Sequence, residues 1–125
     1  MKKQIIFISI FVVIGALIIM TRCFRKPLIG EFELSDYQYF IENFSSEEIL
    51  GEIIDSKDAI IKAEKTWIKT YGEGIKDEKP YRIFYDSKND VWLIQGSLQS
   101  NSVGGVANIL ITGNKGKVLA VWHEK

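Results

Sequence analysis

The sequence predicts an α+β domain in which one amphipathic helix packs on a four-stranded antiparallel meander, preceded by an N-terminal transmembrane helix. Three observations lead to this prediction. An apolar run occupies the N-terminus, a long run with helical spacing of apolar residues occupies the middle, and four runs with alternating apolar residues follow. The chain has 125 residues, enough for a single α+β domain, which we place at residues 36–125.

The N-terminal segment, residues 1–26, is predicted to anchor the protein in a membrane. Ile5–Met20 contains Ser9 as its one polar side chain, has Phe11 near its centre, and is flanked by five basic and no acidic residues. As a helix it would span roughly 24 Å, somewhat less than a hydrocarbon core of about 30 Å. The alternative is a helix buried in a soluble core, which apolar residues on every face disfavour.

Three fates of this segment are considered: retention, cleavage and lipid modification. A retained single-pass anchor in the bacterial cytoplasmic membrane is favoured, because Thr21-Arg22-Cys23 matches a signal-peptidase site poorly. The alternatives are a cleaved signal and a lipoprotein modified at Cys23, which Arg22 disfavours. Basic residues flank both ends, so the positive-inside rule does not orient the segment. Its short N-terminal tail favours an extracytoplasmic C-terminal domain.

Residues 27–35 are predicted to be a linker, because they contain Pro27 and Gly30 and begin a change of charge sign. Residues 36–44 are predicted to form a short helix, with Ser35 as a possible N-cap and with four apolar residues on one face. Ser45 and Glu48 have the spacing of a capping box, which predicts a further helical turn through Leu50. The four apolar residues are Tyr37, Phe40, Ile41 and Phe44.

The strongest helical pattern runs from Lys57 to Tyr71. Asp55 or Ser56 can cap its start, and Gly72 is a natural end. Its apolar stripe comprises Ala59, Ala63, Trp67 and Tyr71. On the opposite face, Lys62, Lys65 and Lys69 are predicted to face solvent, and Asp58 and Lys62 are predicted to form an i,i+4 ion pair.

After Gly74 the apolar period changes to two, which predicts four strands. Their ranges are 81–86, 91–98, 104–112 and 117–123, and the short connections imply an antiparallel meander. Trp67, Trp92 and Trp122 are predicted to be core residues. Their alternative role is to line a pocket between the helix and the sheet.

The residue inventory disfavours several kinds of active site. One cysteine and one histidine, His123, cannot form a Cys/His zinc cluster, and His123 near the C-terminus is a poor candidate for the base of a nucleophile triad. Asp86 with Tyr81 and Tyr85 is the enzyme-like alternative, but strand alternation puts Asp86 on the other face. We therefore predict that the protein is not an enzyme and has no catalytic residue, metal or cofactor.

The charges are unevenly distributed, although the formal net charge is zero. A net charge of zero disfavours a nucleic-acid binder. Residues 27–58 contain nine acidic residues and one basic residue. This stretch predicts contact with a basic partner, with Glu47, Glu48 and Glu52 as the preferred contacts. The alternative is a solvated acidic face that keeps the protein soluble.

The order of short motifs from Asp55 to the C-terminus is similar to that of a bacterial family. The motifs are Asp58-Ala59-Ile60, Ala63-Glu64, Trp67, Tyr71-Gly72, Lys79-Pro80-Tyr81, Val91-Trp92, Gly96, Gly104-Gly105-Val106-Ala107, Gly116-Lys117-Val118 and His123-Glu124-Lys125. This pattern resembles the small immunity proteins with a nuclear transport factor 2-like fold, found beside polymorphic toxins. The resemblance implies a cone-like α+β fold and a protein that binds and neutralises a cognate toxin.

The expected function is therefore that of a membrane-anchored immunity protein whose partners are a toxin, basic in charge, and the membrane. The alternative is an anchored small-ligand-binding or envelope accessory module. The resemblance brings no catalytic residue, and the sequence predicts no oligomeric state.

Overall fold

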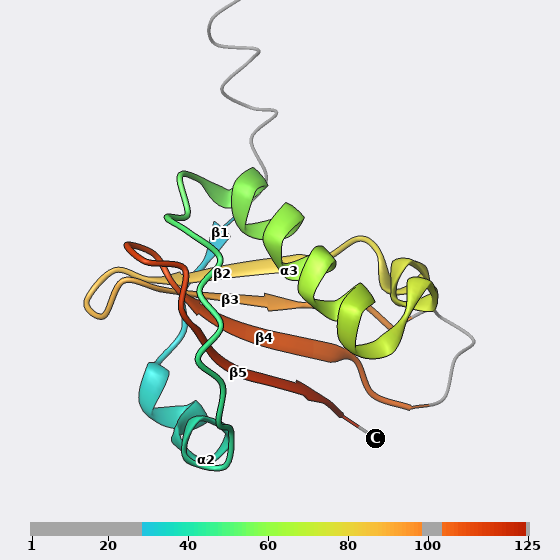
Figure 1. Cartoon of the computed structure of the whole chain (residues 1–125), viewed down its shortest axis with the longest axis horizontal. Helices are drawn as coiled ribbons and strands as arrows, with labels where there is room; N and C mark the ends of the chain where they lie inside the picture. The colour runs from blue at the N-terminus through green and yellow to red at the C-terminus, as the bar shows by residue number, and fades with distance from the viewer. Residues whose placement is uncertain (1–28, 99–103, 125) are drawn as a thin grey trace, which may run out of the picture.

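The computed structural model describes residues 29–98 and 104–124. In this part of the chain a five-stranded sheet is covered by a long helix, α3, on one face and by the N-terminal residues on the other (Figure 1). The strands are β1 (Ile29–Gly30), β2 (Arg82–Asp86), β3 (Val91–Gln95), β4 (Ala107–Thr112) and β5 (Val118–His123). The helical elements are η1 (Leu34–Tyr37), α2 (Gln38–Glu42), α3 (Ser56–Tyr71) and η2 (Glu73–Glu78).

The predicted membrane segment, Ile5–Met20, lies outside the described residues. Within residues 29–98 and 104–124, no helix is both long enough and apolar enough to cross a membrane.

The sheet has five strands and not the predicted four. Strands β2 to β5 form the expected antiparallel meander, but β1 pairs in parallel with β2, with Ile29 opposite Ile83. This strand falls in the range interpreted as a linker, where two residues are too few to show an alternating pattern. Gly30 belongs there because a Cβ at this position would lie 2.6 Å from Cδ1 of the Phe84 ring.

Helix α3 covers one face of the sheet as its periodicity predicts, except that Tyr71, the last residue of the predicted apolar stripe, is 41% exposed at the end of the helix. Asp55 caps it by accepting a hydrogen bond from the Asp58 N–H at 2.8 Å, and Gly72, with φ of +89°, ends it. Ala59 and Ala63 bring the helix close to the sheet, and the fully buried Trp67 fills the interface. The Trp67 indole Nε1 donates to the Asn108 carbonyl at 3.3 Å. Trp92 lies in the same core, so side chains occupy the space between helix and sheet.

Residues 29–44, which we call the N-terminal arm, cover the opposite face of the sheet. Its predicted apolar face, from Tyr37 to Phe44, packs on Val91, Leu93, Leu110 and Ala120. Phe40 stacks on Trp122 with ring centroids 4.1 Å apart and planes within 7°. Trp122 thus lies under the arm, away from Trp67, and is only partly buried. Glu33, and not Ser35, precedes the first helical turn, and no side chain caps it.

Residues 45–54, which we call the edge segment, are extended and not helical. The predicted capping box from Ser45 to Glu48 is wrong, because the Glu48 N–H is bonded to Ser46 Oγ at 3.1 Å. The backbone pairs instead with the β4–β5 hairpin: the Val118 N–H donates to the Glu48 carbonyl, and the Leu50 N–H donates to the Gly116 carbonyl. Long-range pairing therefore overrides the local helical signal.

Candidate functional site

The three glutamates predicted to contact a partner all lie in the edge segment, but they do not share one face. In an extended segment successive side chains point to opposite sides. Glu47 is exposed, whereas Glu48 is partly buried and its carboxylate lies 3.4 Å from the Lys69 ammonium on α3. Glu52 is exposed and follows Gly51, where a φ of +87° turns the chain. Glu47 and Glu52 are therefore free to meet a partner, while Glu48 faces α3.

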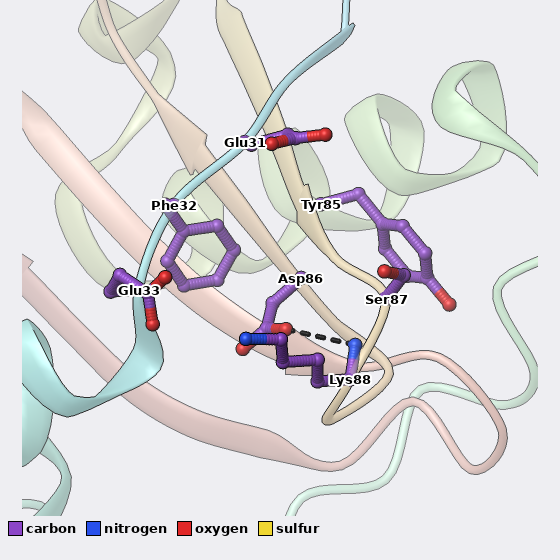
Figure 2. Close-up of a pocket in the computed structure, with 7 residues that line it drawn as sticks. All are labelled: Glu31, Phe32, Glu33, Tyr85, Asp86, Ser87 and Lys88. Carbon is purple, nitrogen blue, oxygen red and sulfur yellow. Dashed lines mark hydrogen bonds between the residues drawn. The ribbon is translucent and has the colours of Figure 1, made fainter.

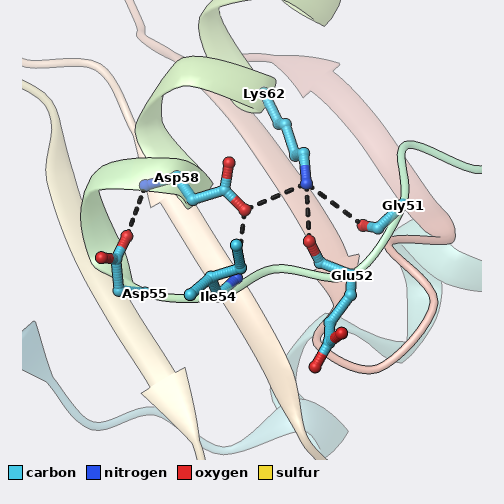
Figure 3. Close-up of polar contacts among 6 residues, drawn as sticks. All are labelled: Gly51, Glu52, Ile54, Asp55, Asp58 and Lys62. Atoms are coloured by element: carbon cyan, nitrogen blue, oxygen red, sulfur yellow. Dashed lines mark hydrogen bonds and ion pairs between the residues drawn. The ribbon is translucent and has the colours of Figure 1, made fainter.

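Lys62 fastens the edge segment to α3 (Figure 3). Its ammonium donates to the Glu52 carbonyl at 2.6 Å and lies 3.0 Å from Asp58 Oδ2. The predicted i,i+4 pair is thus confirmed. The Lys62 side chain, predicted to face solvent, is only 22% exposed because it folds back over the backbone carbonyls of the edge segment.

Asp58 completes this contact from the first turn of α3. Its Oδ2 accepts a hydrogen bond from the Ile54 backbone N–H at 3.0 Å (Figure 3). This bond, together with the bond from Lys62, lowers the pKa of the Asp58 carboxyl. The ionised Asp58 and Lys62 therefore hold both ends of the stretch from Glu52 to Ile54 in place.

The acidic charge predicted from the sequence lies on the surface of the arm and the edge segment. Residues 29–55 contain eight acidic residues and no basic residue. Among the residues that the structure describes, Glu48 alone of these eight forms an ion pair. The other seven are exposed: Glu31, Glu33, Asp36, Glu42, Glu47, Glu52 and Asp55. The arm and the edge segment, together with Asp55 directly after it, thus form an acidic surface. The predicted preferred contacts, Glu47, Glu48 and Glu52, are three of its residues.

An open cleft of about 390 Å³ lies between the arm and the turn after β2 (Figure 2). Glu31, Phe32 and Glu33 line it on the arm side, with Tyr85, Asp86, Ser87 and Lys88 across from them. Asp86 accepts hydrogen bonds from the Lys88 N–H at 3.0 Å and from the Asn89 amide at 2.7 Å. The Asn89 bond lowers the pKa of Asp86, so this carboxylate is ionised at neutral pH.

The residues of the enzyme-like alternative are engaged in separate contacts. The Tyr85 hydroxyl donates to Asp90 Oδ1 at 2.7 Å, and the Tyr81 hydroxyl donates to Glu64 Oε2 at 2.7 Å. Burial, followed by the bond to Glu64, raises the pKa of Tyr81. Asp86 points to the opposite face of β2, as strand alternation predicts. The structure therefore does not bring these groups together as an acid and a base.

His123 lies at the exposed end of β5, as expected for a residue near the C-terminus. Its Nε2 is 3.1 Å from Glu78 Oε2, and its ring makes an edge contact with Tyr71. Glu78 also accepts a hydrogen bond from the Ala107 N–H at 2.7 Å. These contacts tie η2 to the ends of two strands, which is a structural role.

Comparison with known proteins identifies the scaffold on which these surfaces are built. A family described as NTF2 fold immunity protein matches residues 58–125. The match covers nearly all of α3, together with η2 and strands β2 to β5, and leaves the arm and the edge segment outside. No curated protein and no solved structure gives a significant match.

Proposed function

Because this chain belongs to the family of NTF2 fold immunity proteins, we propose that it protects a bacterial cell by binding and neutralising a cognate protein toxin. The observation that carries this proposal is the family match over the helix and the meander. The helix and mixed sheet agree with the NTF2-like fold, and a neutralising protein of this kind acts through a surface. Such a protein needs shape and charge complementary to its toxin.

We propose that the acidic surface of the arm and the edge segment recognises the toxin. Three observations support this assignment: the surface lies outside the family match, it contains no basic residue, and seven of its eight acidic side chains are exposed. A toxin whose own target is anionic would carry a basic surface. Opposite potentials would speed the encounter of such a toxin with the acidic surface, and salt would weaken the effect.

We propose that the protein is a stoichiometric binder and not an enzyme. The separate engagement of Tyr81, Tyr85 and Asp86 supports this proposal. Residual toxin activity should therefore fall in proportion to added protein and reach its minimum at a fixed molar ratio. Continued loss of toxin activity at a large excess of toxin would indicate turnover and contradict the proposal.

We propose in addition that Ile5–Met20 holds the protein in the cytoplasmic membrane with the domain on the extracytoplasmic side. The support is the apolar run with its basic flanks. Fractionation of cells expressing the full-length chain tests this point. Recovery in the soluble fraction at the unprocessed mass would contradict it.

The proposed function predicts that a toxin domain is encoded next to this chain, and it is tested with that domain. Cells that express this domain should survive when the full-length chain is co-expressed. The purified full chain should bind the domain, and Glu47→Lys with Glu52→Lys should reduce the association rate by about tenfold or more at low salt and by less at high salt. Glu48→Lys is measured separately, because Glu48 contacts Lys69.

The matched control reverses two exposed acidic residues of the family scaffold, Glu73→Lys and Glu124→Lys. Glu73 pairs with Lys76 at 2.8 Å, but the pair is exposed and contributes little to stability. It changes the net charge equally, so it separates the location of the charge from its amount. Equal association rates for the two double variants would exclude the acidic surface as the recognition site. Failure of the wild-type chain to bind or protect would overturn the proposed function itself.

A further inference from the structure

The face of α3 that points away from the sheet presents isoleucine between lysines. Ile61 lies opposite the buried stripe of the helix and is 57% exposed, with Lys57 and Lys65 one turn to either side. Ile54, 81% exposed, lies directly before the N-cap Asp55. A helix of a soluble domain usually places polar residues at its outermost positions. The combination of these exposed isoleucines with the lysines makes this face of α3 a candidate docking surface.

The acidic residues of α3 do not neutralise this face, because both are engaged elsewhere. Asp58 pairs with Lys62 in the contact to the edge segment, and Glu64 accepts the Tyr81 hydroxyl and lies 3.1 Å from the Lys79 ammonium. The bond from Tyr81 lowers the pKa of Glu64, so its charge is held in that cluster. Within the described part of the chain, Lys57 and Lys65 form no ion pair.

Lys69 continues the basic row along the helix. Its side chain is 75% exposed, and the exposed contact to Glu48 at 3.4 Å is of the kind that contributes little. Leu50 and Ile61 line an open groove of about 410 Å³ beside this row. We call Ile54, Lys57, Ile61, Lys65 and Lys69 the outer stripe of α3. The stripe is basic and apolar, with the exposed Glu52 and Asp55 next to Ile54 at its N-terminal end, whereas the arm on the other face of the sheet contains no basic residue.

We propose that the outer stripe of α3 docks on a lipid surface that carries anionic headgroups. A helix lying in a membrane interface buries an apolar face at the headgroup boundary and places lysines against anionic lipids. Ile54 and Ile61 supply the apolar groups, and the three lysines supply the charge. The charge of the stripe is complementary to an anionic lipid surface, whereas the acidic arm would be repelled by it.

The predicted anchor would bring such a surface within reach. Eight residues separate Met20 from Ile29, and they can span at most about 30 Å, which is close to the diameter of a domain of this size. The bilayer is then present at high effective concentration, so weak docking is sufficient. Docking through α3 turns the opposite face of the sheet, with the acidic arm, away from the membrane. It thus sets the orientation of the domain independently of any toxin.

A fluorescent label at position 61 reports whether the stripe meets lipid. The full-length chain with Cys23→Ser and Ile61→Cys carries an environment-sensitive fluorophore and is reconstituted in vesicles. The vesicles contain phosphatidylcholine alone or phosphatidylcholine with phosphatidylglycerol. We expect a blue-shifted emission in the anionic vesicles only. A label at Tyr39→Cys, 70% exposed on α2, is the control and should remain in water in both.

Charge reversal of the row tests the electrostatic part of the proposal. Lys57→Glu, Lys65→Glu and Lys69→Glu together should abolish the shift and lower the docking equilibrium by on the order of a hundredfold. The matched control reverses three exposed lysines outside the stripe that form no ion pair in the described part of the chain, Lys88, Lys115 and Lys117. Thermal unfolding of each variant, followed by circular dichroism, verifies that the domain remains folded.

The outcomes separate lipid from protein as the occupant of the stripe. Equal emission from position 61 in neutral and anionic vesicles overturns the proposal. A blue shift that requires added toxin also overturns it, because the stripe would then be a protein-docking face. If the chain does not embed, the tether that makes weak docking sufficient is absent, and this outcome also overturns the proposal. The inference rests on the proposed membrane segment but not on toxin neutralisation, because the measurements without toxin detect the docking by themselves.

Discussion

The two layers that cover the sheet differ in how completely their side chains are buried. Helix α3 has sixteen residues and buries Ala59, Ala63, Thr66 and Trp67 completely or nearly so. The N-terminal arm consists of two short helical elements, η1 and α2, in which no residue is buried. The α3 layer is thus a packed core element, whereas the arm is attached by partly exposed aromatic rings such as Phe40.

This difference matches the proposed division between a family scaffold and a recognition surface. The family match covers nearly all of α3 and the meander but not the arm. A tightly packed layer tolerates few changes of side-chain volume, because adding or removing even one methylene group in it lowers stability. Exposed side chains can be exchanged for others of different charge with little loss of stability, since surface substitutions usually change the free energy of unfolding by less than about 0.5 kcal/mol. The arm is therefore the part of the domain that can be adapted to a partner.

The largest effect is expected from a change in the α3 layer. Trp67→Ala should destabilise the domain by about 3–5 kcal/mol, because it removes a fully buried indole and its bond to the Asn108 carbonyl. Denaturant unfolding of the full chain measures this change. An unfolding midpoint close to that of the wild type would show that α3 is not the main core element and would remove the contrast between the layers.

A smaller effect is expected from the corresponding change in the arm. Phe40→Ala removes the stack on Trp122 but empties a partly exposed position, so we expect a loss of about 2 kcal/mol. Near-ultraviolet circular dichroism should change, because the environment of Trp122 changes. A loss as large as that of Trp67→Ala would mean that the two layers contribute equally to stability.

Breaking the contact between α3 and the edge segment should cost less stability still. Lys62→Met removes the ammonium that binds the Glu52 carbonyl and Asp58, and we expect a loss of about 1–2 kcal/mol. Lys65→Met, on the same helix but without an ion pair in the described part of the chain, is the matched control and should change stability by less than about 0.5 kcal/mol. Hydrogen exchange at Ile54, whose N–H is bonded to Asp58, should become faster in the first variant only.

The α3 layer and the meander could be predicted from the sequence, whereas the arm layer could not. An element that buries one face repeats its apolar residues about every 3.6 positions in a helix, as at Ala59, Ala63 and Trp67, and every two positions in a strand such as β2. Both spacings involve residues that are close in the sequence, so they can be recognised without knowledge of the fold. The predicted strand over 91–98 ends at Gln95 in the structure. Strand β1 and the docking of the arm depend on partners more than 40 residues away, such as Phe84 and Trp122.

The candidate site was predicted in composition but not in geometry. The acidic excess of residues 29–55 is a property of the sequence, and the structure places it on the surface. Which glutamates share a face depends on whether residues 45–54 are helical or extended. Pairing with the β4–β5 hairpin makes them extended, so Glu48 turns toward Lys69 while Glu47 points away. The pair of Lys62 with Asp58 followed from the i,i+4 spacing, but the contact of Lys62 with the edge segment could not be predicted, because its partners there are backbone carbonyls.

The smallest predicted effect concerns acid, at the contact between α3 and the edge segment. The hydrogen bond from the Ile54 N–H and the bond from Lys62 lower the pKa of Asp58 below its ordinary value of 3.8. A lowered carboxyl pKa stabilises the folded state fully above the unfolded-state pKa, and this contribution is lost as pH falls through the folded-state pKa. The free energy of unfolding of the wild type should therefore fall below about pH 4. The Asp58→Asn variant should lose less over this range, because it lacks the carboxyl that titrates. Comparing the wild type with Asp58→Asn isolates this share, because Glu64 and Asp86, whose pKa values are also lowered, are present in both. If the two proteins lose stability in parallel between neutral pH and pH 2, the contact does not depend on the Asp58 charge, and the edge segment is held by its pairing with the hairpin alone.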